Sequence, residues 1–315
     1  MIINLPATDA AGVNAALVRA RHDVGVASSM VFTLIVIADL KSYDSVFNAC
    51  KDAGREHPSR IIVITNGLSR TSKVDAEIHM GEEVPGEIIS LRFHGEVIEH
   101  RDSVVLALLL PDSPVIAWWP QSSPLRPGDD PVGRLAARRI TDAMGSSRPL
   151  AAIEARARNY CPGDTDLTWT RLTPWRALLA AAVDQYPSRI SEVRVASAPQ
   201  NAAGSLLAAW LESRLGVPVH RGESVKGLGI TEVVLKTDKG DISITRTDGR
   251  MASFSAPGLP RRQVALRRRD VNALITEELR RLDIDDIFAA TMETLVERCE
   301  RDQTRRAEAA LRAGK

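Results

Sequence analysis

The chain has 315 residues and is poor in both cysteine and aromatic side chains. Its three cysteines, Cys50, Cys161 and Cys299, are far apart in the sequence, and no C-x-x-C pair occurs. This pattern argues against a disulfide framework and indicates a reducing compartment, so we expect a cytoplasmic protein. Aromatic residues make up only 4% of the chain, so any local concentration of tryptophan is informative.

Long apolar runs are also missing. The most apolar stretches, 31–37 and 104–110, are far shorter than the ~20 residues that a helix needs to cross a bilayer. Residues 1–6 carry no basic segment followed by an apolar core, so we expect no secretory leader. The net charge of +1 creates no strong field toward nucleic acid or an anionic membrane. We expect neither as a partner.

Sequence motifs that carry catalysis are absent as well. The chain has no phosphate-binding glycine loop, no G-x-S-x-G nucleophile elbow and no H-E-x-x-H pattern. Its six histidines lack paired metal-ligand spacing. Asp283, Asp285 and Asp286 are best interpreted as a helix start, where carboxylates are favoured. We therefore predict no catalytic residue, no metal and no cofactor.

The chain does contain alternating helical and strand patterns, which favour an α/β fold class with α+β character. The composition, 44% hydrophobic and 26% charged, is that of a globular protein. We predict two domains, 1–160 and 161–300, each a mixed β-sheet flanked by helices, with a helical C-terminus. Residues 301–315 are polar and are expected to form a flexible tail.

Helical periodicity and strand-forming runs place the elements of this fold. Helices are expected at 8–27, 43–56, 97–110, 134–144, 173–186, 201–215, 270–282 and 284–299. Strands are expected at 31–37, 60–64, 74–80, 87–93, 115–118, 190–195, 217–220, 231–236, 241–246, 251–255 and 263–266.

One helix start is signalled especially clearly. Thr173 is a natural N-cap, and Pro174 follows at the first helical position, where its missing N–H group costs nothing. Trp175 then begins an apolar face that repeats at helical spacing. We interpret Thr173, Pro174 and Trp175 as structural residues.

A four-residue pattern, Pro-Ser-Arg-Ile, occurs at 58–61 and again at 187–190. Each copy ends a predicted helix and begins a predicted strand. Two interpretations stay open, a coincidence and a pair of related α-β units. In both, Arg60 and Arg189 follow a helix end, where the helix dipole favours a cation. We assign structural roles to these two arginines and to His57.

Four of the five tryptophans lie within residues 104–182. Trp118 and Trp119 are adjacent, so in a strand they point to opposite faces. Trp169 lies among acids, hydroxyls and an arginine, a setting typical of an interface anchor. Two alternatives stay open: these tryptophans pack together where the domains meet, or they contact a partner protein. The candidate partner-binding residues are Trp118, Trp119, Asp164, Asp166, Trp169 and Arg171.

Arginines also flank the strand predicted at 263–266: Arg261 and Arg262 before it, and Arg267, Arg268 and Arg269 after it. A solvated sheet edge that resists strand pairing is the simplest interpretation. A salt-bridging contact with an acidic protein surface is the alternative. Nucleic-acid binding is disfavoured, because no aromatic residues are interleaved for base stacking.

Four segments resemble the family of glucose-6-phosphate dehydrogenase assembly proteins, OpcA, and most of all its actinobacterial branch. They are HPSR (57–60), LLPDSPVIAWWP (109–120), RRITD (138–142) and PGDTDLTWTRLTPWR (162–176). The likeness extends from the first residues to about residue 300.

The resemblance implies a cytoplasmic protein that is not an enzyme. It implies binding to glucose-6-phosphate dehydrogenase, assembly of the active oligomer and allosteric activation, in support of the pentose phosphate pathway and NADPH supply. The alternative is a sugar-phosphate-binding enzyme or sensor in which Arg60, Arg171 and Arg189 act as anion clamps. Redox control does not carry over, because no matching cysteine pair is present.

Overall fold

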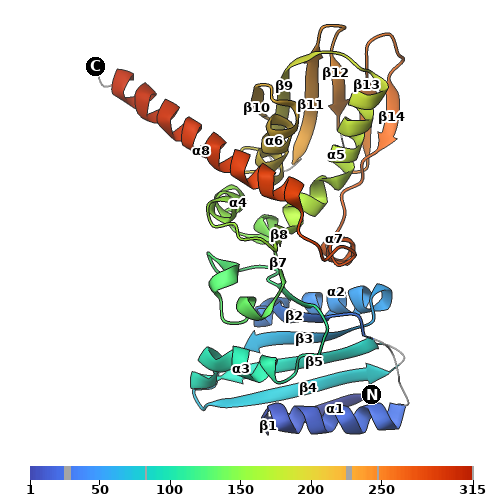
Figure 1. The fold of residues 1–315 in the computed structure, drawn as a ribbon, viewed down its shortest axis with the longest axis vertical. Helices are drawn as coiled ribbons and strands as arrows, with labels where there is room; N and C mark the ends of the chain where they lie inside the picture. Colours follow the sequence, from blue (N-terminus) through green and yellow to red (C-terminus); the bar gives the residue numbers. More distant parts are fainter. Residues whose placement is uncertain (25–29, 82–83, 225–228, 247, 314–315) are drawn as a thin grey trace. The chain divides into compact units, whose positions relative to one another are not determined.

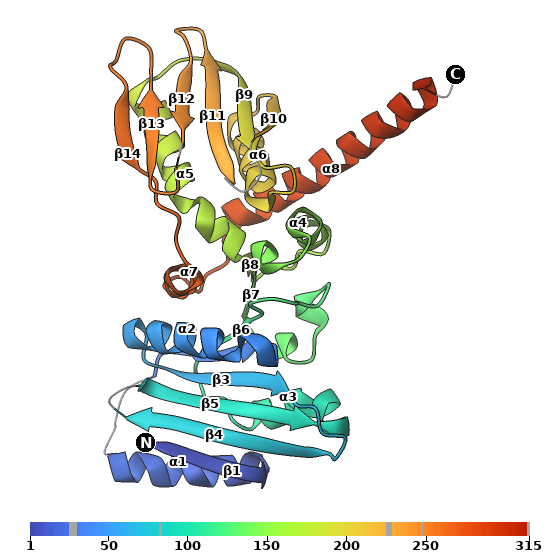
Figure 2. The same cartoon turned by 180° about the vertical axis from the view of Figure 1, so that it is seen from behind.

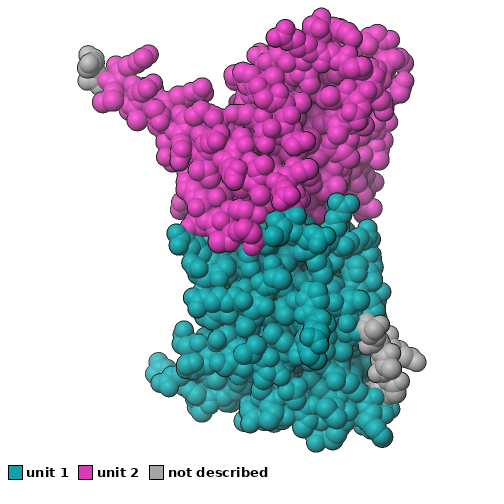
Figure 3. Space-filling view, viewed as in Figure 1, with its two compact units in different colours: residues 1–142, 163–165, 270–284 teal, residues 143–162, 166–269, 285–315 magenta. Residues whose placement is uncertain are grey.

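The computed structural model describes residues 1–315 except 25–29, 82–83, 225–228, 247 and 314–315. The chain forms two compact units, which are coloured separately in Figure 3. Each unit contains a mixed β-sheet with helices against it, which confirms the predicted fold class. The domain boundaries given above remain a prediction. Unit 1 comprises residues 1–142, 163–165 and 270–284, and unit 2 comprises 143–162, 166–269 and 285–315.

Unit 1 is built on an eight-stranded sheet. The central strands pair in parallel, and the continuous apolar runs predicted to be buried on both faces form two of them. Antiparallel pairs complete one side of the sheet. In sheet order the strands are β1 (Ile2–Thr8), β4 (Lys73–Gly81), β5 (Val84–His94), β3 (Ser59–Asn66), β2 (Thr33–Ile37), β6 (Val115–Trp118), β7 (Arg138–Thr141) and β8 (Asp164–Asp166).

Helices cover both faces of this sheet (Figures 1 and 2). Val13 and Leu17 of α1 share a buried cluster with Ile62 and Ile64 of β3, whereas the alternate residues of β3 point to the other face, on which α2 packs. The predicted helix at 97–110 is shorter than expected, because a 3-10 turn η2 replaces its first part. The helices and 3-10 turns are α1 (Ala10–Val24), η1 (Leu40–Ser42), α2 (Tyr43–Glu56), η2 (Gly95–His100), α3 (Arg101–Leu106), η3 (Pro127–Asp129), η4 (Gly133–Leu135) and α7 (Val271–Glu278).

The chain start differs from the sequence prediction. Residues 2–8 form strand β1, which the sequence did not reveal, and α1 therefore begins at Ala10. The carboxylate of Asp9 accepts a hydrogen bond from the Gly12 amide at 2.8 Å, so Asp9 caps this helix. Residues 25–27 of the predicted helix lie outside the described residues.

The prediction of a helix over 134–144 is wrong. Strand β7 lies there, paired in parallel with β6, and a 3-10 turn η5 (Ala143–Gly145) follows it. Both arginines of β7 are buried, because Arg138 pairs with Glu278 and Arg139 with Asp164. Partners this far away in the sequence stabilise the strand, and local helix propensity does not reveal them.

Helix α7 packs on α2 although more than two hundred residues separate them in the chain. Asn272 donates to Asp52 at 2.7 Å, and Arg280 pairs with Glu56 at 2.7 Å. Asp270 caps α7, because its carboxylate accepts from the Ala273 amide at 2.9 Å.

Unit 2 contains a six-stranded sheet. Strands β9 and β10 are parallel and are connected through α6, and all other neighbours are antiparallel. The strands predicted at 231–236 and 241–246 pair with each other as the antiparallel hairpin of β11 and β12. In sheet order the strands are β10 (Val219–Glu223), β9 (Ile190–Ser197), β11 (Ile230–Thr237), β12 (Ile242–Thr245), β13 (Met251–Ser255) and β14 (Arg262–Ala265).

Helices pack with this sheet in one core (Figure 1). The sequence did not reveal α4. Helix α8 is tied to α6 by Arg298 and Arg301, which both pair with Glu212. It continues to Ala313, so the described part of the predicted flexible tail is helical. The helices are α4 (Pro149–Arg158), α5 (Leu167–Gln185), α6 (Ala202–Leu215) and α8 (Asp286–Ala313).

The prediction that Thr173 caps a helix is also wrong. Helix α5 begins at Leu167, and its N-cap is Asp166, whose side chain accepts from the Thr168 amide at 2.8 Å. Pro174 therefore lies inside the helix, where it removes the N–H group that would bond the carbonyl of Thr170. The guanidinium of Arg269 donates to that carbonyl instead, which compensates for the missing bond.

Candidate functional site

The tryptophans predicted to contact a partner are all buried in the chain. Trp118 is fully buried at the end of β6. Trp119, which is 2% exposed, packs with Ala117 and Ala136. Trp119 packs with Ala117, two residues before it, so the ring of the adjacent Trp118 points to the opposite face, as the sequence indicated. The indole N–H of Trp118 has no hydrogen-bond partner among the described residues.

Trp169 lies within α5 and is 3% exposed. Its indole Nε1 donates to Asp285 Oδ2 at 2.7 Å, and the guanidinium of Arg176 stacks 3.5 Å from the centre of its ring. Phe288 of α8 packs against it, with 5.5 Å between the ring centres. The polar residues around Trp169 in the sequence are thus a helix start and its cap, and the ring itself belongs to the core of unit 2.

The two acidic candidates have structural partners. Asp164 pairs with Arg139 inside unit 1. Asp166 caps α5 and also accepts from the Ala143 amide at 2.9 Å, so one carboxylate fixes a helix start and the turn η5. Of the six candidates, only Asp164 and Arg171 keep partial exposure.

The residues assigned structural roles differ in burial. Arg60 is 4% exposed, and its guanidinium bonds Glu87 at 2.9 Å and the carbonyl of Leu108 at 2.5 Å. Because these contacts engage its guanidinium group, Arg60 does not act as an anion clamp. His57 is half-buried beside Phe32, and Arg189 is exposed, with its backbone N–H bonded to Asp238 at 3.1 Å.

Arg21 pairs with Glu87 as well, so two arginines share one carboxylate and form an ion-pair cluster with it. Burial alone would raise the pKa of Glu87, but the hydrogen bond from Arg21 and the charge of Arg60 outweigh burial, and the pKa is lowered. Burial lowers the pKa of Arg60 despite the opposing charge of Glu87. Arg60 and Glu87 are at most 4% exposed, so the cluster is a buried structural feature of unit 1.

The structure places the arginines at 261–269 in two different surroundings. Arg262 lies on β14, the edge strand of the sheet, and both Arg261 and Arg262 are exposed, as a solvated sheet edge requires. Arg267, Arg268 and Arg269 instead line a cavity of about 310 Å³ in unit 2. We call this cavity the arginine pocket. Its lining residues are Met144, Arg171, Leu172, Pro174, Trp175, Ala198, Asn201, Ala203, Gly229, Ile230, Arg246, Leu266, Arg267, Arg268 and Arg269.

The arginine pocket combines five guanidinium groups with an apolar wall, and no carboxylate is among its described lining residues. Arg246 is half-buried, and its guanidinium lies 5.2 Å from the centre of the Trp175 ring. Burial, and then the charge of Arg268, lower the pKa of Arg246 to about 10. Arg246 therefore stays charged at neutral pH although its surroundings disfavour the charge.

The sequence identified Arg171 and the arginines at 267–269 but missed Arg246, Asn201 and Gly229. These residues come from the start of α6 and from segments that flank β11 and β12. No local motif joins them, so their convergence is a product of the sheet topology. Gly229, which precedes β11, has a φ of +69°, a conformation that favours glycine. It is the one position of the three that a search of the sequence for turns would find.

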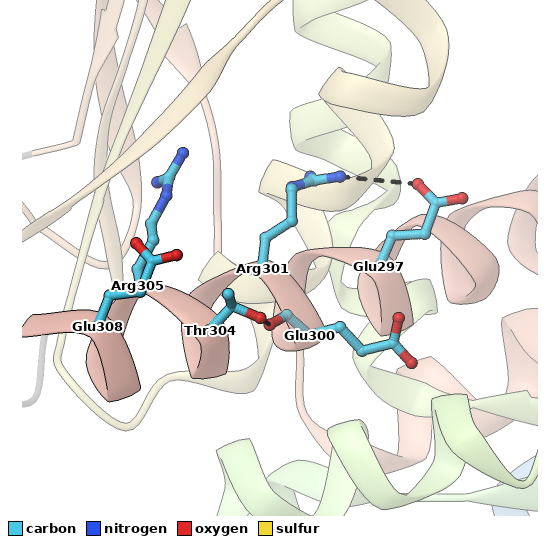
Figure 4. Close-up of a pocket in the computed structure, with 6 residues that line it drawn as sticks. All are labelled: Glu297, Glu300, Arg301, Thr304, Arg305 and Glu308. Carbon is cyan, nitrogen blue, oxygen red and sulfur yellow. Dashed lines mark hydrogen bonds and ion pairs between the residues drawn. The ribbon is translucent and has the colours of Figure 1, made fainter. Parts of the chain in front are cut away.

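In the described part of the chain, two other surface depressions show no grouping of side chains that suggests a binding site. Along the exposed face of α8, acidic and basic side chains are interspersed, and Glu297 pairs with Arg301 at 3.8 Å (Figure 4), as on a solvated helix. A shallow depression in unit 1 is lined by Tyr43 and Ser90, whose hydroxyl oxygens are 2.6 Å apart. Among the described residues no cluster suited to a metal ion occurs, and no helix is both long and apolar enough to span a bilayer.

Comparison with known proteins connects both halves of the chain to one family. Residues 50–158 match the N-terminal domain of the glucose-6-phosphate dehydrogenase subunit, and residues 162–292 match its C-terminal domain. The chain is also similar to an OpcA protein of Synechocystis, named for the OxPP cycle, at 27% identity over 179 residues. That match covers 50% of this chain and 37% of the Synechocystis protein, so this chain corresponds to well under two thirds of that relative.

Among solved structures, a 3-ketoreductase of Actinomadura kijaniata is 10% identical, with a TM-score of 0.46, over 84% of this chain and 94% of that one. Gal80p of Kluyveromyces lactis is 9% identical, with a TM-score of 0.45, over 86% and 89% of the two chains. Likeness of this extent supports no conclusion about ligand or reaction. The two adjacent domain matches do carry a conclusion: the chain belongs to the OpcA family of glucose-6-phosphate dehydrogenase subunits.

Proposed function

We propose that this protein is a non-catalytic assembly factor that binds glucose-6-phosphate dehydrogenase in the cytoplasm. The observation that carries the proposal is the pair of domain matches. Together they extend from residue 50 to residue 292, and both families are named for a subunit of that dehydrogenase. In this role the protein promotes the active oligomer and raises its activity, which supports the pentose phosphate pathway and NADPH supply.

The physical basis of activation is a difference in affinity. A partner that binds the active form of the dehydrogenase more tightly than the inactive form shifts the population toward the active form. A tenfold shift requires a difference in binding free energy of about 1.4 kcal/mol, which a few interface contacts supply. Such a partner needs no catalytic groups of its own.

The proposed contact surface includes Arg171 rather than the buried tryptophans. Trp118, Trp119 and Trp169 are at most 3% exposed, so a partner does not reach them without rearrangement of the chain. Arg171 keeps partial exposure on α5, and arginine is enriched among the residues that dominate binding. The tryptophans then act by fixing the elements that present this surface.

The test is co-purification of the two proteins and an assay of the dehydrogenase with and without this chain. We expect a joint peak in size-exclusion chromatography and a higher initial rate or a changed substrate dependence. An equal mass of serum albumin is the control for crowding and surface adsorption. Separate peaks together with unchanged kinetics would rule out the proposed function.

A further inference from the structure

The arginine pocket has the features of an anion-binding site rather than those of a solvated surface. Five arginines line it without a carboxylate among the described lining residues, and like charges this close repel one another. The charge of Arg268 disfavours that of Arg246, and the charge of Arg171 disfavours that of Arg269. A bound anion would relieve this repulsion.

Three hydrogen-bond donors of the pocket surround one point. A methyl group added to Gly229 would lie 3.5 Å from Arg268 Nη2 and 3.7 Å from Arg246 Nη2. The same point is 3.8 Å from Asn201 Nδ2. Charge-assisted hydrogen bonds place an acceptor oxygen about 2.8 Å from the donor nitrogen. The three donor nitrogens therefore converge on the space beside Gly229, where the lack of a side chain leaves room for the oxygens of an anion.

The orientation of Asn201 is fixed by a second contact. Asn201 is the N-cap of α6, and its Oδ1 accepts from the Gly204 amide at 2.7 Å. Because the oxygen is used in this way, the Nδ2 donors are left to face the pocket. The start of α6 adds the positive end of a helix dipole to the same region, which favours a negative charge.

Arg246 retains unused hydrogen-bonding capacity. One of its nitrogens, Nη2, donates to the carbonyl of Ile230 at 3.0 Å. Its Nε is buried and has no partner among the described residues. Burying an unpaired donor is unfavourable, so this arrangement is better suited to a state in which an acceptor occupies the pocket.

We infer that the arginine pocket binds the phosphate group of a small phosphorylated molecule. The volume of about 310 Å³ is at the lower end of the range for ligand sites, which suits a small metabolite rather than a protein segment. Trp175, Leu172 and Leu266 form an apolar wall beside the charged groups, and they receive the uncharged part of that molecule. The inference does not rest on the proposed function.

The experiment is calorimetric titration of the full chain with inorganic pyrophosphate at low salt, with sodium chloride of equal ionic strength as the reference. Saturable binding of one pyrophosphate per chain is expected. Arg268→Gln and Arg246→Gln should each weaken binding about tenfold or more, because each removes a charge-assisted hydrogen bond. Arg250→Gln is the matched control: Arg250 is exposed and lies outside the pocket, and its loss should change affinity less than twofold.

Two results would overturn the inference. One is saturable binding that Arg268→Gln leaves unchanged, since Arg268 is exposed and its replacement does not disturb the core. The other is an absence of pyrophosphate binding, including the case in which a hexaglutamate peptide binds instead, because the occupant is then an acidic protein segment. No dehydrogenase is present in this titration, so its result is independent of the assembly assay.

Discussion

Trp169 and Asp285 join two helices of unit 2 through one carboxylate. The indole of Trp169 in α5 donates to Asp285 Oδ2 at 2.7 Å, while Oδ1 accepts from the Phe288 amide at 2.9 Å. Asp285 therefore caps α8 and fixes the Trp169 ring at the same time. A residue that looked like an interface anchor in the sequence thus holds the framework of its own unit.

Replacing Trp169 by Phe should destabilise unit 2 by about 1.5 kcal/mol, because it removes a hydrogen bond to a charged acceptor but keeps a ring against Phe288. Thermal or urea unfolding measures the change. In a double-mutant cycle with Asp285→Ala, a coupling of about 1 kcal/mol is expected.

The matched control for this cycle is Trp210→Phe. Trp210 lies on α6 and packs against the same core, but no hydrogen bond of its indole is part of the Trp169 contact. Its replacement should be additive with Asp285→Ala. Additivity of Trp169→Phe with Asp285→Ala would contradict the proposed link.

The interior proline of α5 gives a second prediction. Arg269 donates to the carbonyl of Thr170, to which Pro174 cannot donate because it has no N–H group. Arg269→Ala should therefore cost about 1 to 2 kcal/mol of stability in the natural sequence. In a Pro174→Ala background the helix supplies its own N–H group, and the same substitution should cost less.

Urea unfolding of the four proteins in this cycle measures the difference. Arg267→Ala is the control, since Arg267 is exposed and has no part in the Thr170 contact. An equal cost of Arg269→Ala in both backgrounds would show that the arginine does not compensate for the proline.

The sequence predicted well wherever local chemistry decides the structure. Helix α2 and strands β6 and β13 have the predicted bounds, and α6 ends at Leu215 as predicted and starts one residue later, after its cap Asn201. In each case the caps, the turns and the hydrophobic spacing agree with one another. These elements need no distant partner to fix where they begin and end.

The failures occur where distant residues change a local preference. Thr173 and Pro174 look like a helix start, but Arg269 makes an earlier start possible. The two arginines of β7 look helical, but Glu278 and Asp164 hold them in a buried strand. The sequence did not predict the arginine pocket for the same reason, because several separate segments supply its donors.

The ion-pair cluster in unit 1 predicts a dependence of stability on pH. The pKa of Glu87 is lowered in the folded protein, so as the pH falls the unfolded chain takes up the proton first. The stabilisation is fully present above the unfolded pKa of about 4.3 and is lost as the pH falls through the lowered folded value. Glu87→Gln should cost about 3 kcal/mol at pH 7 and much less at pH 3.

Urea unfolding followed by circular dichroism at the two pH values measures this difference. Glu99→Gln serves as the control, because Glu99 is exposed in the turn η2 and should behave alike at both pH values. A cost of Glu87→Gln that is independent of pH would exclude the cluster as the source of the acid sensitivity.

The three cysteines should differ strongly in reactivity. Cys161 is exposed, whereas burial raises the pKa of Cys50 to about 12 and, with a smaller effect of Glu154, that of Cys299 to about 11. The thiolate is the reactive form, and at pH 8 a thiol of pKa 11 is ionised to about one part in a thousand. A disulfide reagent should therefore modify Cys161 first, and mass spectrometry of peptides identifies the site.

The variant Cys161→Ser tests the same order of cysteine reactivity, because it removes the thiol expected to react first. This variant should lose the fast phase of modification and keep two slow thiols: the buried Cys50 reacts only when the protein unfolds, and the partly exposed Cys299 reacts slowly because its pKa is raised. Rapid modification of Cys299 in the folded variant would contradict the predicted order, because the packing of α8 against α6 and α4 half-buries this thiol and raises its pKa.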